Sequence, residues 1–229
     1  MPTPLEAMRT VARRLAPVRV PYAFLGGAIV PLLLDNPRLI EFRPTKDVDA
    51  LVQILTKGAY YKLEEKLTQA GFCSLAAESG PICRWQVNEC VVDLMPTTTD
   101  VLGLSARWFP EALERAILRD LGDGVAALVV TVAAFLATKL DAFQDRGDDD
   151  YYASHDLEDV IVVIDGCSRV AEEVAAASDP MRRYIADSMV AFLSNERFRD
   201  ALPGHFPNDA VAAGRRRIVL NRMAVLSRL

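Results

Sequence analysis

The hydrophobic pattern of this 229-residue chain changes near Pro110. Before that point short apolar runs of strand length alternate with amphipathic segments, whereas beyond it the spacing of apolar residues is almost entirely helical. Short strands followed by a series of helices predict an α+β fold, with a mixed sheet and flanking helices followed by a C-terminal helical domain. We expect an α/β domain over residues 1–125 and a helical domain over residues 126–229.

The expected elements follow from strand-length runs, helical spacing and turn residues. We expect strands at residues 22–25, 48–54, 72–76, 82–87, 90–95 and 126–130, with Asn88-Glu89 joining two of them as a hairpin. We expect helices at residues 3–15, 28–34, 58–70, 131–145, 155–164, 168–177, 180–200 and 208–228.

Composition excludes several classes of protein. The net charge of −5 argues against a protein whose whole surface coats nucleic acid. The longest apolar run, residues 125–137, is interrupted by Thr131 and is shorter than the roughly 20 residues that cross a bilayer. Four cysteines without a CxxC pair fit neither a disulfide framework nor a zinc site. The first residues lack the pattern of a secretory signal, so we expect a cytoplasmic protein without a membrane partner.

Two aspartates stand at alternate positions of an apolar strand, in Asp47-Val48-Asp49-Ala50-Leu51. Residues i and i+2 of a strand share a face, so Asp47 and Asp49 present two carboxylates side by side. Like charges beside a core repel unless a cation lies between them, and a hard divalent ion such as Mg²⁺ or Mn²⁺ meets this need. Asp93 is a third acid within an apolar strand, and it joins the pair if its strand neighbours residues 48–54.

A diglycine between a strand and a helix complements the aspartates, because it could bind the phosphates whose metal ion the aspartates would hold. Gly26 and Gly27 let the backbone approach a phosphate closely, and the following helix begins with unpaired N–H groups. Each motif alone is weak, because a diglycine is usually a plain turn and an isolated DxD motif usually lies on a solvated surface. Their order along the chain is more specific than either motif.

The order Leu25-Gly26-Gly27, Asp47-x-Asp49 and Asp93 resembles the nucleotidyltransferase superfamily. The segment Arg43-x-Thr45-x-Asp47-x-Asp49, with Thr138-Lys139-Leu140, Arg146 and Asp156-Leu157-x-Asp159 farther on, resembles AbiEii-type nucleotidyltransferases, which are the toxin components of type IV toxin–antitoxin systems. The match spans residues 22 to about 160, and the later helices carry no motif of the family.

The resemblance implies a nucleotidyltransferase-like fold and a role for each matching residue. Asp47 and Asp49 would hold two metal ions, and Asp93 would share the second ion and help to remove a proton. The catalytic residues would be Asp47, Asp49, Asp93, Lys139 and Asp156. The nucleotide would be bound by Gly26, Gly27, Arg43, Thr45, Lys46, Lys139 and Arg146.

Lys139 stands in an otherwise apolar helix, where burial lowers the pKa of a lysine unless an anion meets it. A triphosphate or Asp156 is the expected partner, and either Asp156 or Asp159 could orient the ammonium group. A lysine whose ammonium group reaches solvent from an amphipathic helix is the alternative interpretation. Arg146 lies seven residues beyond Lys139 on the same helical face, so both cations could reach one phosphate chain.

The leading hypothesis is the metal-dependent transfer of a nucleoside monophosphate from a nucleoside triphosphate to an acceptor hydroxyl. The resemblance implies an acceptor such as the 3′ end of tRNA, or a protein hydroxyl, and an antitoxin protein as partner. The alternatives are a small-molecule acceptor, as in antibiotic nucleotidyltransferases, and a non-catalytic module that binds a nucleotide or a partner. Five arginines between Gly214 and Leu229 could bind RNA phosphates or pair with the acid-rich residues 141–165.

Overall fold

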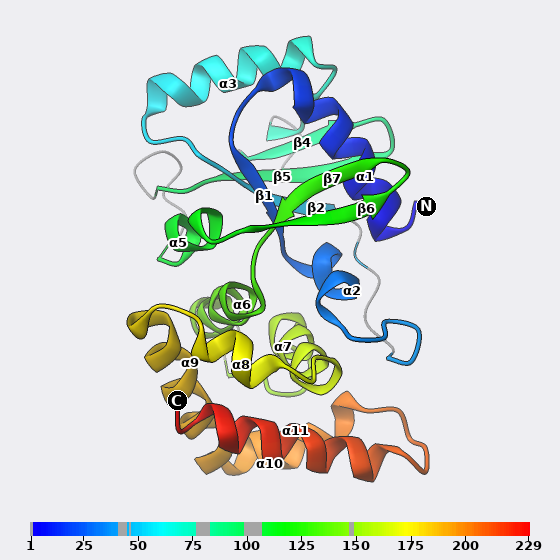
Figure 1. Ribbon diagram of the computed structural model, residues 1–229, viewed down its shortest axis with the longest axis vertical. Helices are drawn as coiled ribbons and strands as arrows, with labels where there is room; N and C mark the ends of the chain where they lie inside the picture. Colours follow the sequence, from blue (N-terminus) through cyan, green and yellow to red (C-terminus); the bar gives the residue numbers. More distant parts are fainter. Residues whose placement is uncertain (1, 41–44, 46, 77–82, 99–106, 147–148) are drawn as a thin grey trace. The chain divides into compact units, whose positions relative to one another are not determined.

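The computed structural model describes residues 2–40, 45, 47–76, 83–98, 107–146 and 149–229. It divides into two compact units. The sheet unit comprises Met1–Ile29 and Pro44–Thr131, and the helical unit comprises Val30–Arg43 and Val132–Leu229. Figure 1 shows the strands gathered in the first and the long C-terminal helices in the second.

The sheet unit contains one mixed sheet of seven strands in the order β3-β4-β5-β2-β1-β7-β6. The strands are β1 (Tyr22–Leu25), β2 (Asp47–Val52), β3 (Cys73–Ser74), β4 (Arg84–Val87), β5 (Cys90–Pro96), β6 (Ile117–Gly122) and β7 (Val125–Val129). β2 pairs with β5 in parallel and with β1 in antiparallel orientation, while β1 pairs with β7 in parallel. This arrangement, with the helices described next, confirms the predicted α+β class.

Strands β4 and β5 form the predicted hairpin. Val87 pairs with Cys90 across the two-residue turn, and Asn88 adopts the left-handed conformation with φ 52°. Asparagine tolerates positive φ better than most residues, which suits it to a tight hairpin turn. The strand that contains Asp93 is therefore held in place by its immediate sequence neighbour on one side and by β2 on the other.

Strand β6 lies between residues 96 and 125, where the sequence pattern predicts no strand. It pairs with β7 at the edge of the sheet, and Gly122, Asp123 and Gly124 turn the chain between them with positive φ. Its side chains are half-buried or exposed except for the buried Leu121, and the polar pair Arg119 and Asp120 interrupts its apolar residues. The turn residues Gly122, Asp123 and Gly124 are the sequence feature that could have predicted a strand before residue 126.

Helices of the sheet unit pack on the sheet and at its ends. They are α1 (Pro4–Leu15), η1 (Ala16–Val18), η2 (Gly27–Ile29), α3 (Lys57–Gln69) and α5 (Phe109–Glu114). α1 begins with a capping box, in which Thr3 and Glu6 each accept a hydrogen bond from the other's backbone N–H. One face of α1, with Met8, Val11 and Leu15 fully buried, contacts the sheet, as Figure 1 shows beside β6 and β7.

The helical unit consists of α2 (Val30–Leu33), α6 (Val132–Arg146), α7 (His155–Gly166), α8 (Val170–Ala175), α9 (Asp179–Ser194), α10 (Glu196–Ala201), η4 (Leu202–His205) and α11 (Ala212–Leu226). A cluster of four aromatic rings, from Phe143, Tyr151, Phe192 and Phe198, joins α6, α9 and α10. The short α2 segment packs on α7 and is tied there by the N–H of Asp35, which donates to the carbonyl of Gly166 over 3.0 Å.

One predicted helix, residues 180–200, is divided in two. α9 ends at Ser194 and α10 begins at Glu196, because Asn195 leaves helical geometry with ψ 122° and caps α10 by accepting the N–H of Phe198. Across the described residues, no helix is long and apolar enough to span a bilayer.

Candidate active site

Three carboxylates share one face of two adjacent parallel strands. Asp49 on β2 lies opposite Asp93 on β5, and Asp47 precedes Asp49 by two residues, so the pleat directs all three to the same side. The neighbouring residues Val48 and Val92 point to the other side and are buried. The condition under which Asp93 joins the pair, that its strand neighbours the strand of Asp47 and Asp49, is therefore met.

Gly26 forms the edge of this acidic face. It follows β1 directly, where Leu25 pairs with Asp49, and it has a positive φ of 74°. A Cβ at this position would overlap the carboxylate of Asp49. Only glycine therefore satisfies both the backbone conformation and the close approach of the aspartate. Gly27 begins the 3₁₀ turn η2.

Arg84 is a member of this face that sequence reasoning missed. It lies opposite Asp93 across the β4–β5 hairpin, and its guanidinium donates from Nε to Oδ1 of Asp93 over 2.8 Å and from Nη2 to Oδ2 over 2.6 Å. Nη2 also lies 3.2 Å from Oδ2 of Asp47. These contacts, the hydrogen bonds to Asp93 first, raise the pKa of Arg84 above its ordinary value, so the residue is a fixed positive charge. The sequence feature that could have identified Arg84 is the two-residue turn Asn88-Glu89. Counting cross-strand partners outward from this turn puts residue 84 opposite residue 93.

The three acids differ in exposure. The side chain of Asp47 is 35% exposed, whereas that of Asp93 is 11% exposed and has both oxygens engaged by Arg84. Across the part of the chain that the structure describes, no three acid, histidine or cysteine side chains converge closely enough to hold one metal ion. A bridging guanidinium, rather than three converging carboxylates, is the arrangement seen at Asp47 and Asp93.

The remaining predicted residues of the sheet unit are only partly described. The Thr45 hydroxyl lies 3.0 Å from Oδ1 and 3.1 Å from the carbonyl of Asp47, so this threonine orients the aspartate. Arg43 and Lys46 lie outside the described residues.

Within the helical unit, Lys139 of α6 pairs with both predicted acids of α7. Its Nζ lies 3.0 Å from Asp156 Oδ1 and 2.6 Å from Asp159 Oδ2, and its side chain is only 12% exposed. Burial opposes the charged form of Lys139, but the two carboxylates together outweigh burial and raise its pKa. Arg146 ends α6, and its side chain lies outside the described part of the structure.

The arginine-rich C-terminal helix makes internal contacts. Nε of Arg215 in α11 donates to Asp165 over 2.8 Å, and Nη1 of Arg222 donates to the carbonyl of Ile164 over 2.7 Å at the end of α7. Pairing with the acid-rich segment thus accounts for Arg215, and capping of α7 accounts for Arg222.

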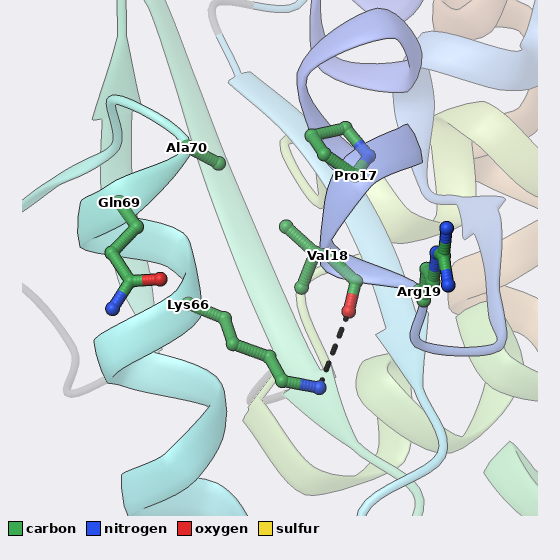
Figure 2. A pocket seen from close by; sticks show the side chains of 6 residues that line it. All are labelled: Pro17, Val18, Arg19, Lys66, Gln69 and Ala70. Carbon is green, nitrogen blue, oxygen red and sulfur yellow. Dashed lines mark hydrogen bonds between the residues drawn. The ribbon is translucent and has the colours of Figure 1, made fainter.

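A hollow of about 400 Å³ lies elsewhere in the sheet unit (Figure 2). It is lined by Pro17, Val18, Arg19, Lys66, Gln69 and Ala70, with Nζ of Lys66 3.5 Å from the carbonyl of Val18. Arg19 precedes the first residue of β1, whereas Gly26 follows the last one. The hollow is therefore at the opposite end of that strand and contains none of the predicted site residues.

No protein-family model matches the sequence, and no curated protein matches it. Solved structures do resemble the fold. The antibiotic-resistance factor ANT(2'')-Ia is 10% identical, with 86% of this chain and 96% of that chain covered at a TM-score of 0.50. A protein from H. pylori assigned as a nucleotidyltransferase is also 10% identical, with 98% and 93% covered at a TM-score of 0.50. At these identities the likeness is one of fold, and that fold is nucleotidyltransferase-like.

Proposed function

We propose that the chain is a metal-dependent nucleotidyltransferase. The oxygen of an acceptor hydroxyl attacks the α-phosphorus of a nucleoside triphosphate, the bond between that phosphorus and the bridging oxygen breaks, and pyrophosphate leaves. The hydroxyl proton passes to a carboxylate of the acidic face or to water. The products are pyrophosphate and an acceptor that carries the nucleoside monophosphate.

The observation that carries this proposal is the register of β2 and β5. It sets Asp49 opposite Asp93, with Asp47 two residues before Asp49 on the same face. Three acids of this kind cost free energy in two strands whose neighbouring residues form the core, and a site for polyphosphate and metal accounts for them. The nucleotidyltransferase-like fold is consistent with this interpretation.

The donor set fits a hard divalent cation. Carboxylate oxygens of Asp47 and Asp49 are the ligands that Mg²⁺ or Mn²⁺ prefers, and water and phosphate oxygens commonly complete the coordination of such ions. When bound, the ion neutralises phosphate charge and lowers the pKa of the attacking hydroxyl. The chain's own contribution is to orient Asp47 through Thr45 and to hold Asp49 against Gly26.

Gly26 and Gly27 are proposed to border the polyphosphate. Residues without a Cβ let the backbone approach a phosphate closely, and Gly26 lies directly beside the carboxylate of Asp49. Contributions of Arg43, Lys46 and Arg146 to nucleotide binding stay predictions from the resemblance, as do those of Lys139 and Asp156 to catalysis.

The acceptor that we propose is the 3′ end of tRNA, as the AbiEii resemblance implies, and an antitoxin partner remains a prediction on the same basis. The test incubates the protein with each α-labelled nucleoside triphosphate, Mg²⁺ and bulk tRNA. We expect label on the tRNA with the natural chain and a loss of at least about 100-fold with Asp49→Ala, because the cation loses a charged ligand. Asp187→Ala, at an exposed position of α9, is the matched control and retains activity.

Two outcomes would redirect the proposal. Label on a small-molecule antibiotic, with none on tRNA, would identify the chain as a small-molecule nucleotidyltransferase, the class suggested by the fold match to an antibiotic-resistance factor. Absence of label from tRNA, protein and small molecules alike, with all four nucleotides, would contradict transfer and favour a nucleotide-binding module.

A further inference from the structure

The β4–β5 hairpin brings a cation into the acidic face. Arg84 and Asp93 are cross-strand partners in a hairpin whose turn has only two residues, so their backbones stay opposite each other as long as the hairpin exists. The guanidinium binds Asp93 through two parallel hydrogen bonds of 2.8 and 2.6 Å. Paired, charge-assisted bonds of this kind are among the strongest hydrogen bonds in proteins.

The contacts of Arg84 distinguish Asp93 from the other two acids. Both oxygens of Asp93 accept from the guanidinium, and the side chain is only 11% exposed. Asp47 has one oxygen near Arg84, at 3.2 Å, and its side chain is 35% exposed. The other oxygen of Asp47 accepts from the neutral Thr45 hydroxyl over 3.0 Å, and each carboxylate oxygen can accept more than one interaction, so the more exposed Asp47 keeps acceptor capacity for a metal ion. Asp47 is consequently the better placed of these two for a metal ion.

The distances divide the contacts of Arg84 in the same way. Its guanidinium lies 2.8 and 2.6 Å from the two oxygens of Asp93 but 3.2 Å from the nearer oxygen of Asp47. The described residues also contain no set of three metal-binding side chains around one point. The cation that Asp93 contacts in this structure is therefore the guanidinium of Arg84.

We propose that Arg84 is a permanent cation of the site that replaces one of the two divalent ions expected from three acids. The chain then binds one divalent ion, through Asp47 and Asp49, while Asp93 is the partner of Arg84 and not a metal ligand. This inference rests on the proposed function and revises the roles that the family resemblance implies for Asp93.

The experiment counts bound Mn²⁺ by the loss of the free-ion EPR signal during titration of the full chain with Mn²⁺ alone. We expect one ion per chain for the natural protein and for Asp93→Asn, and weakening of at least about tenfold for Asp49→Asn, since Mn²⁺ prefers anionic oxygen ligands. Arg84→Gln frees Asp93, so a second ion should bind. Arg84→Lys keeps the charge and should still bind one.

Arg84→Gln leaves Asp93 without its partner and can therefore lower the stability of the folded chain, so a further variant separates this effect from metal binding. The double variant Arg84→Gln/Asp93→Asn removes both charges and should bind one ion with the affinity of the natural chain. Arg169→Gln, which alters an exposed ion pair of α8, is the matched control and should bind one ion.

The outcomes separate this inference from the proposed function. Two ions in the natural protein, loss of the ion in Asp93→Asn, or an unchanged count of one in folded Arg84→Gln would overturn the role of Arg84 while leaving nucleotidyl transfer in place. No Mn²⁺ bound to the natural chain would overturn the inference together with the proposed metal site. One bound ion without label transfer to any acceptor would uphold the metal count and contradict the transferase.

Discussion

Gly26 is a residue at which the addition of a single methyl group should disable the acidic face. Its φ of 74° is unfavourable for other residues, and a Cβ there would overlap the carboxylate of Asp49. For Gly26→Ala we expect a loss of about 1–3 kcal/mol in the free energy of unfolding, measured by urea denaturation. Transfer activity should fall at least about tenfold, because Asp49 must move away from the metal site.

Gly124→Ala provides the matched control for this prediction. Gly124 also has a positive φ, 69°, but a Cβ there would have no neighbour within 4 Å. Gly124→Ala should lower the free energy of unfolding by only the conformational cost, about 1 kcal/mol, and leave transfer activity unchanged. Equal activity losses in the two variants would mean that the contact with Asp49 is unimportant.

Lys139 gives a second prediction, about stability and pH. Lys139→Met removes the ammonium group that the buried carboxylates of Asp156 and Asp159 share, which should cost about 3–5 kcal/mol in the free energy of unfolding. Because folding raises the pKa of Lys139 above 10.5, its contribution is fully present below that pH and is lost as pH rises through the folded value.

The measurement is urea denaturation of both proteins between pH 7 and 11. The difference in stability should be constant up to about pH 10 and shrink above it. Lys62→Met, at an exposed position of α3, is the control and should change stability by less than about 0.5 kcal/mol. A small effect of Lys139→Met, similar to that of the control, would indicate that the buried pair contributes nothing to folding.

At the scale of elements, Asn195 decides where one helix ends and the next begins. Its side chain caps α10 through the N–H of Phe198 and donates to the Tyr151 hydroxyl over 3.1 Å. Asn195→Ala should reduce the free energy of unfolding by about 1–2 kcal/mol, because the cap is lost.

Thermal or urea denaturation of Asn195→Ala and Asn195→Asp measures this effect. Aspartate can accept the same backbone N–H but cannot donate to Tyr151, so it should lose less than alanine. Asn195→Ala as stable as the natural chain would contradict a stabilising cap. It would fit a variant in which α9 and α10 fuse into the single helix that periodicity predicts for residues 180–200.

At the scale of the whole molecule, ligand binding should raise the stability of the folded chain. A nucleotide with Mn²⁺ at about 100 times its dissociation constant adds roughly 2.7 kcal/mol, which corresponds to a rise in Tm of about 5–10 °C for a protein of this size. Differential scanning fluorimetry with each of the four nucleotides measures the shift and ranks them.

The shift should require both the ion and the acidic face. EDTA should abolish most of it, and Asp49→Asn should reduce it by about half or more, since the stabilisation grows with the logarithm of the ligand concentration divided by the dissociation constant. Undiminished shifts in Asp49→Asn would place the nucleotide away from the acids.

Local features of the sequence were sufficient for much of the fold. Apolar runs of strand length mark β2 and β5, Asn88-Glu89 marks the hairpin turn between β4 and β5, and Thr3 marks the start of α1. These predictions succeed because period, turn chemistry and capping depend on residues within a few positions of one another. The sequence by itself thus determined that Asp47 and Asp49 share a face and that a diglycine follows the first strand.

Tertiary structure alone decided which distant groups meet. The parallel pairing that sets Asp49 opposite Asp93, the contact of Arg84 with Asp47, and the pairing of Lys139 with Asp159 as well as Asp156 all depend on packing between separate segments. The edge strand β6 was missed for the same reason, since its partner β7 rather than its own composition holds it extended. Strand register and helix contacts follow from how apolar faces fit together, a property of the assembled chain that no short window of sequence contains.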